Sequence, residues 1–295
     1  MGATPVMLKF DSWPEFVTYA AHQPTDMDPN MRQSRREAGD GFTGVDTFEA
    51  AVKLANEGWT KGTNEMKSIL EPMFDHVSKM IERVEVNHDI EGHVIDVARY
   101  VDGEPECWMK FEDVLQEAEQ GNKLIRITFN MCVSAGIGTK TIMCKGGAIA
   151  ALCELLEYAG HRVEIVLCDA NGLNSWYSAD GNKGQGKLNF ENYITIKPFN
   201  QNLDPSIVSY ALAHPSCFRR LEFSVMECLP ADLRREIGVG FTYGNVADVP
   251  KDKWGDIHIG PAMLGEPQWT DPASTEKWLV GQLEKQGIHL KKEAV

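Results

Sequence analysis

Residues 124–170, LIRITFNMCVSAGIGTKTIMCKGGAIAALCELLEYAGHRVEIVLCDA, decide the fold. The apolar run LIRITFNMCV predicts a buried strand over residues 124–133. Residues 139–159 have the apolar spacing of a helix, and Gly160 follows as the left-handed residue that commonly ends one. HRVEIVLCDA then predicts a second strand. A strand, a helix and another strand in this order indicate a parallel unit of an α/β sheet.

The same alternation continues toward the C-terminus. YITIKPF (193–199), RLEFSVMEC (220–228) and DIHIGPAM (256–263) predict three further strands. Helices are predicted over LDPSIVSYALAHP (203–215), DLRREIG (232–238) and STEKWLVGQLEKQG (274–287). Near-continuous apolar strands are typical of sheets that are covered on both faces. We therefore predict a doubly wound, mainly parallel, Rossmann-like α/β domain over residues 121–295.

Residues 1–120 predict a mainly helical extension with some β structure. Asp11 or Ser12 is suited to begin one helix, and Asp46 or Thr47 another, because these side chains accept hydrogen bonds from exposed helix N–H groups. A longer amphipathic helix is predicted over residues 62–84. HVIDVARYV (93–101) and ECWMKF (106–111) predict two short strands.

Composition and charge limit the classes of protein to which this chain can belong. The 295 residues carry a net charge of −14, which disfavours non-specific binding to duplex nucleic acid. No apolar run is long enough to predict a membrane span, and the first residues do not predict a signal peptide. Seven scattered cysteines without a CxxC pair predict reduced thiols in a cytosol-like compartment.

The segment FNMCVSAGIGTKTIMCKGG (129–147), which begins at the end of the first predicted strand, contains parts of two phosphate-binding motifs. A P-loop needs Lys directly after its second Gly, but Thr139 separates Gly138 from Lys140. A dinucleotide turn needs a third Gly where Thr141 stands, because helix and strand approach closely there. A cation site at the carboxyl end of the strand is the third alternative.

The order of elements over residues 120–290, with the segment 124–168 at its start, resembles a von Willebrand factor A-type domain. That family holds a divalent cation with Asp-x-Ser-x-Ser after its first strand, and the matching positions here are Asn130, Cys132 and Ser134. Only Ser134 fits the motif. Asp204 and Glu227 lie where further charge would be supplied. Neutral Asn130 and soft Cys132 are poor ligands for Mg²⁺, so the resemblance implies a degenerate metal site in which Mg²⁺ is disfavoured.

Two other groups of residues are candidates for binding. Trp176 and Tyr177 lie in a predicted polar loop, where aromatic side chains are suited to contact a protein partner. The best basic clusters are QSRRE (33–37) and FRRLE (218–222). Their arginines, candidates for nucleic-acid contact, are Arg35, Arg36, Arg219 and Arg220.

The chain also resembles proteins of tailed bacteriophages whose activity is not known, through QSRREAGDGFTG, FEAAVKLANEGW, EPECW and YALAHPSCFRRLEF. This resemblance implies a place in the cytoplasm of an infected bacterium or in the virion. Our leading hypothesis is a non-enzymatic adaptor whose A-type domain binds a phage or host protein. The binding surface would be the loops at the carboxyl edge of the sheet, near Ser134, Asp204, Glu227 and Trp176, and no membrane would be involved. The alternatives are a nucleic-acid-associated factor, which binds single-stranded DNA or recruits a polymerase, and a metal- or nucleotide-dependent enzyme.

Overall fold

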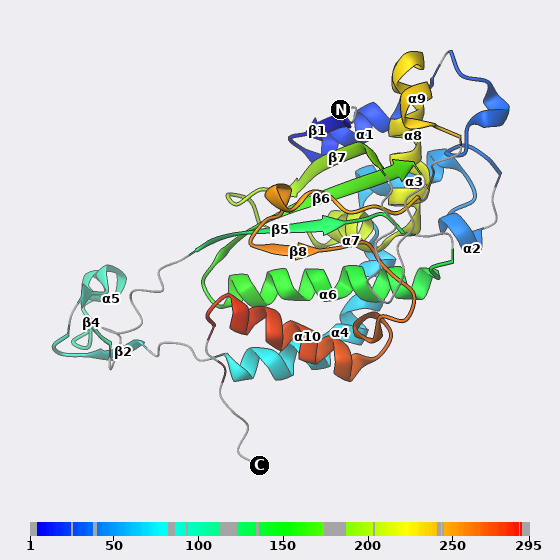
Figure 1. Ribbon diagram of the computed structural model, residues 1–295. Coiled ribbons are helices and arrows are strands. Elements are labelled where there is room, and N and C mark those ends of the chain that lie inside the picture. The colour runs from blue at the N-terminus through cyan, green and yellow to red at the C-terminus, as the bar shows by residue number, and fades with distance from the viewer. Residues whose placement is uncertain are drawn as a thin grey trace.

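The computed structural model describes residues 5–24, 26–37, 40–81, 86–92, 94–111, 123–133, 136–173, 187–202, 204–240, 243, 245–288 and 290. Its centre is a five-stranded sheet in the order β1-β7-β6-β5-β8 (Figure 1). The strands are β1 (Val6–Phe10), β5 (Leu124–Asn130), β6 (Arg162–Leu173), β7 (Lys187–Lys197) and β8 (Ile257–Ile259). The mixed α/β class and the mostly parallel sheet are confirmed.

The strand directions give a correction within this class. β6, β5 and β8 run parallel, and so do β1 and β7, but β7 runs antiparallel to β6. The predicted strand over 193–199 begins earlier, at Lys187, so that β6 and β7 form a long antiparallel pair. Antiparallel neighbours need no crossover connection, unlike the parallel pairs of this sheet.

The helices begin and end largely where the sequence predicts. Ser12, Thr47 and Asp204 cap α1, α3 and α7 with their side-chain oxygens. Gly160, with φ of 93°, follows α6. The helices of the main body are α1 (Trp13–Ala21), α2 (Asp40–Thr43), α3 (Phe48–Glu57), α4 (Thr60–Met80), α6 (Thr139–Tyr158), α7 (Pro205–Ala213), α9 (Ala231–Ile237) and α10 (Pro272–Lys285), with short 3-10 turns η1 (Pro29–Met31), η4 (Lys251–Lys253) and η5 (Pro267–Trp269).

The strand predicted over 220–228 is wrong. Residues 217–227 form the π-helix η3 (Cys217–Glu222) and the helix α8 (Phe223–Glu227), and every side chain in both is buried. A helix that is buried on all sides lacks an amphipathic period, so it cannot be told from a central strand by pattern alone.

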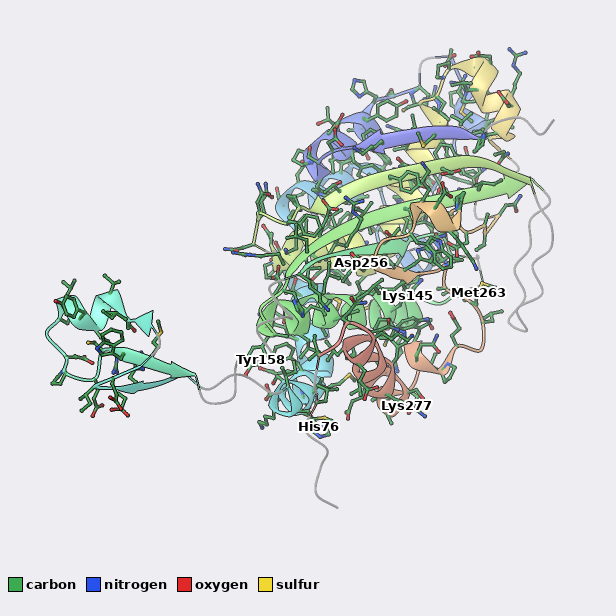
Figure 2. All side chains as sticks on the ribbon, turned by 60° about the vertical axis from the view of Figure 1, so that its left-hand side comes forward. His76, Lys145, Tyr158, Asp256, Met263 and Lys277 are labelled. Atoms are coloured by element: carbon green, nitrogen blue, oxygen red, sulfur yellow. The ribbon has the colours of Figure 1, made fainter. Side chains whose placement is uncertain are left out.

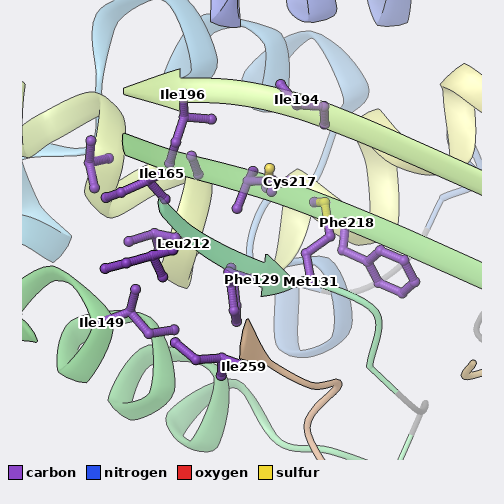
Figure 3. Packing of buried hydrophobic residues seen from close by; sticks show 14 of the residues in the cluster. Phe129, Met131, Ile149, Ile165, Ile194, Ile196, Leu212, Cys217, Phe218 and Ile259 are labelled. Atoms are coloured by element: carbon purple, nitrogen blue, oxygen red, sulfur yellow. The ribbon is translucent and has the colours of Figure 1, made fainter. Parts of the chain in front are cut away.

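The main core lies between one face of the sheet and the helices. Helices α1, α6 and α7 pack against this face, where alternate residues of β5, β6 and β7 point inward (Figure 3). The opposite face carries the exposed Leu124 and an ion pair between Arg126 and Glu164, and a small cluster at Cys168 and Ala170. The predicted doubly wound arrangement is therefore not confirmed.

Residues on both sides of the predicted boundary at 120 share this sheet and core. β1 pairs with β7, and Phe10, Trp13 and Phe16 belong to the same buried cluster as Phe129.

Residues 86–111 form a second, three-stranded sheet with one short helix, which we call the 86–111 unit. The strand order is β2-β4-β3, with β2 (Val86–Asp89), β3 (Val94–Ile95) and β4 (Trp108–Phe111). The strand predicted over 93–101 is correct only at β3, because α5 (Val97–Val101) takes the rest, capped by Asp96. The predicted strand over 106–111 is confirmed as β4. Figures 1 and 2 both show this unit apart from the main body.

Candidate functional site

Asn130 ends β5 at the position where the resemblance implies a metal-binding Asp. Its side chain is buried. The Oδ1 atom accepts the Cys132 N–H at 2.9 Å, and Nδ2 donates to the Ala247 carbonyl at 2.9 Å and to Asp248 Oδ1 at 3.1 Å. The amide therefore ties the end of β5 to the segment before β8, and its oxygen already has a partner.

Cys132 is fully buried beside this amide. Burial, followed by the nearby charge of Asp169, raises the pKa of its thiol well above the ordinary value. A protonated thiol is a poor metal ligand and a poor nucleophile. Ser134, the one position that matches the motif, lies outside the described residues, as do Trp176 and Tyr177.

Asp204 and Glu227 serve the fold. Asp204 Oδ1 accepts hydrogen bonds from the N–H groups of Ser206 and Ile207 at the start of α7. Glu227 accepts the Ser34 N–H at 2.9 Å, the Ser34 hydroxyl, and the Tyr243 hydroxyl at 3.0 Å. Within the described residues, no group of three or more His, Cys, Asp or Glu side chains is arranged to hold a metal ion. Asn130, Cys132, Asp204 and Glu227 as placed here do not fit Mg²⁺.

A polar centre that no sequence motif indicates lies between the ends of β5 and β8. Lys145 on α6 (labelled in Figure 2) donates to the carbonyls of Gly260 at 2.6 Å and Asn130 at 3.3 Å. Burial lowers the pKa of this ammonium group to about 8. His258 on β8 contacts Asp248 at 3.0 Å and stacks on Trp254 at 4.2 Å. No motif spacing links these residues, because their contacts arise only from the strand order.

Two buried carboxyls form a second network on the core face of the sheet. Asp169 on β6 lies opposite Asn192 on β7 in the strand register, and Glu222 ends η3. Asn192 Nδ2 donates to both Glu222 oxygens at 2.9 Å, and Asn171 Nδ2 donates to Asp169 Oδ2 at 2.6 Å. The two carboxyl groups also interact directly, because each affects the pKa of the other.

This carboxyl network holds protons at neutral pH. Burial raises the pKa of Asp169 to about 7. Burial, and then the charge of Asp169, raises the pKa of Glu222 well above its ordinary value. Two adjacent carboxylates in a buried site cannot both ionise without a large penalty, so a protonated Glu222 donates to Asp169. The sequence carries only part of this signal, since Asp169 lies near the end of the predicted strand HRVEIVLCDA.

Three of the four predicted arginines, Arg35, Arg219 and Arg220, anchor the chain on either side of α2 to the core. Arg220 is fully buried and donates to the carbonyls of Ser34, Val45 and Asp46, and at 3.4 Å to that of Arg36. Arg219 is buried and donates to the carbonyls of Phe42 and Ile137.

Arg35 is half-buried, donates to the Ser224 hydroxyl at 3.0 Å and lies over the Phe48 ring. Only Arg36 is exposed. These arginines hold the loop on η3 and α8, so they present no continuous basic surface to a nucleic acid.

The 86–111 unit presents the clearest candidate surface. We call the side chains of Val97, Tyr100 and Val101 the α5 surface; their exposed fractions are 68, 64 and 75%. Spacings of three and four residues place them on one side of the helix. Nearby, His88 contacts Asp96 at 3.1 Å, so this pair holds the start of α5 to β2.

Comparison with known proteins gives the family but no activity. The family model of a domain of unknown function, DUF7192, matches residues 3–289, so the chain belongs to this family. Comparison with curated proteins and with solved structures gave no match. Among the described helices, none combines the length and the apolar character that crossing a membrane requires.

Proposed function

We propose that this chain is a non-enzymatic adaptor that binds a protein partner through the α5 surface. The observation that carries the proposal is the exposure of three large apolar side chains on one side of a five-residue helix. Single exposed apolar residues are ordinary, but a contiguous group on a small projecting unit is typical of a protein-binding surface.

The 86–111 unit is a small sheet of three short strands. Among its side chains whose burial is described, Cys107 is the one buried hydrophobic residue. Sheets of so few short strands depend for their stability on packing of an apolar face against another element. Covering the α5 surface would contribute about 1.5–3 kcal/mol for each large apolar side chain that is fully buried. A partner would thus stabilise the unit as it binds.

The charge of the unit indicates the chemistry of the partner. Residues 86–111 contain six acidic and two basic side chains, a net charge of −4 with histidine neutral. An apolar surface with an acidic surround is complementary to an apolar segment with basic residues around it. We therefore propose a basic, amphipathic partner segment, supplied by a phage or host protein if the phage resemblance holds.

The main body serves as the scaffold in this proposal. We propose that it has the A-type architecture that the resemblance implies, with a metal position that has lost its ligands. Three features support this proposal. The helix α6 follows β5 along the chain, Gly160 and Val163 match the Gly-x-x-Val with which that family enters its second strand, and Asn130 holds backbone groups where an Asp would bind the ion.

The test compares the triple variant Val97→Thr, Tyr100→Gln, Val101→Thr with a matched control. Leu264→Gln removes a side chain that is 63% exposed but lies outside the unit. Cross-linking and quantitative mass spectrometry in cells that make the protein should show a partner that the triple variant loses and the control keeps. Capture of the same proteins by the triple variant would refute the proposal.

A further inference from the structure

A pocket of about 280 Å³ lies where α4, α6 and α7 meet, and no residue of the 86–111 unit is among its lining residues. Its apolar wall is contributed by all three helices. This wall includes Met66, Phe74, Ala151 and Val208. The hydroxyls of Thr63 and Ser209, 3.0 Å apart, add two oxygen atoms to the lining.

Charged side chains complete the lining of this pocket. Glu71, Asp75 and Glu154 contribute three carboxylates, and Lys67 contributes one ammonium group. Among the described residues, no hydrogen bond or ion pair engages the three carboxylates. Partial burial raises the pKa of Glu154, although its residue is exposed overall, and the charge of Lys67 opposes this shift only in part. A second cation in the pocket would therefore be favourable.

We propose that this pocket binds an organic cation: an ammonium or guanidinium group on a short apolar stem. The negative charge excludes anions, and the apolar wall favours a ligand with a hydrocarbon part over a bare metal ion. Small-molecule pockets span about 300–1,000 Å³, so this pocket fits a ligand the size of one side chain. The cation is either a free amine or a Lys or Arg side chain of another protein.

The test titrates the full chain with n-butylammonium and n-butylguanidinium, and follows heat and NMR shifts. Neutral n-pentanol is the comparison ligand. We expect saturable binding of the cations with a dissociation constant on the order of 1 mM, and at least about fivefold weaker binding of the alcohol. No saturable binding of either cation, or equal binding of the alcohol, overturns the proposal.

Two variants assign the binding to the pocket. Glu71→Gln with Glu154→Gln removes two carboxylates from exposed positions, so the fold should persist. The control Glu65→Gln changes a residue of the same helix that pairs with Lys61 and lies outside the pocket. We expect the double variant to weaken binding about fivefold to tenfold and the control to leave it unchanged. Equal affinity for the double variant and the wild-type chain overturns the proposal.

A peptide arm separates the two sources of the cation. Acetyl-Gly-Gly-Lys-Gly-Gly-amide is titrated beside the same peptide with Gln in place of Lys. Tighter binding of the Lys peptide than of n-butylammonium assigns the pocket to a protein side chain. Binding of the free amine alone assigns it to a small-molecule amine.

Discussion

Replacing Glu222 with Gln tests the buried carboxyl network, and we expect the variant to be more stable than the wild-type chain in mild alkali. In the folded chain the pKa of Asp169 is about 7, and that of Glu222 is raised well above its ordinary value. Both groups therefore bind more protons folded than unfolded between about pH 4 and pH 7. Their contribution to stability is greatest below about pH 4 and is lost as the pH rises through 7.

The Asp169 pKa sets the scale of the penalty that this network imposes in mild alkali. Raising the pKa of Asp169 from 3.8 to about 7 lowers the free energy of unfolding by about 4 kcal/mol at a pH where this carboxyl must ionise in the folded chain. The amide introduced by Glu222→Gln would keep an oxygen for Asn192 and offer an N–H to Asp169 without needing a proton. A hydrogen bond to a charged group contributes about 1.5–3 kcal/mol. We therefore expect a gain of about 1–3 kcal/mol for Glu222→Gln at about pH 8.5.

The assay is urea unfolding followed by circular dichroism at several pH values between about 5 and 8.5. The control is Glu227→Gln, which weakens a buried acceptor of the Ser34 N–H and should destabilise the chain throughout. The reasoning is refuted if Glu222→Gln keeps the wild-type dependence on pH, or loses more than about 2 kcal/mol at the alkaline end.

Three further predictions concern stability and use the same unfolding assay. Gly146→Ala should lower the free energy of unfolding by about 1–3 kcal/mol, because a Cβ there would lie 2.5 Å from the Leu212 carbonyl oxygen. Gly281→Ala, with open space in α10, should raise it by about 0.5–1 kcal/mol. A gain in stability at both positions would contradict this reasoning. Arg220→Lys should lower the free energy of unfolding by about 3 kcal/mol, because one ammonium group cannot reach all the carbonyls that the guanidinium holds. An unchanged urea midpoint would argue against the anchoring role of Arg220. Burial lowers the pKa of His214 to about 4, so its contribution to stability is fully present above about pH 6.5 and is lost on acidification through 4. His214→Phe should reduce that acid-induced loss of stability by about 2–3 kcal/mol. An unchanged acid transition would refute this prediction.

The sequence predicted the elements whose signals are local. Apolar runs and boundary residues located β5, α6, β6 and α7, and Ser12 and Thr47 were among the residues predicted to begin α1 and α3. The sequence could not predict that β7 runs antiparallel to β6, because the direction of a strand depends on the strand with which it pairs. The buried helix over 217–227 was mistaken for a strand, because it is surrounded by core on all sides.

The candidate sites were harder to predict, because their residues meet only in three dimensions. Arg219 and Arg220 stand in a cluster that is typical of an exposed basic patch, yet they lie inside and hold backbone carbonyls. Asp169 and Glu222 are 53 positions apart in the sequence and meet through the strand order and η3. The α5 surface was hidden within a predicted strand, where its side chains would have alternated between two faces.

Site-specific photo-cross-linking at Tyr100 tests the adaptor proposal most directly. A photoreactive phenylalanine derivative replaces Tyr100 in one chain and Leu264 in the control, and both are irradiated in cells that make the protein. Both positions are exposed, at 64 and 63%, so they differ in place and not in accessibility. The proposal predicts one protein, with a basic amphipathic segment, joined at position 100 and absent at position 264. No adduct at position 100, or the same adducts at both positions, would contradict it.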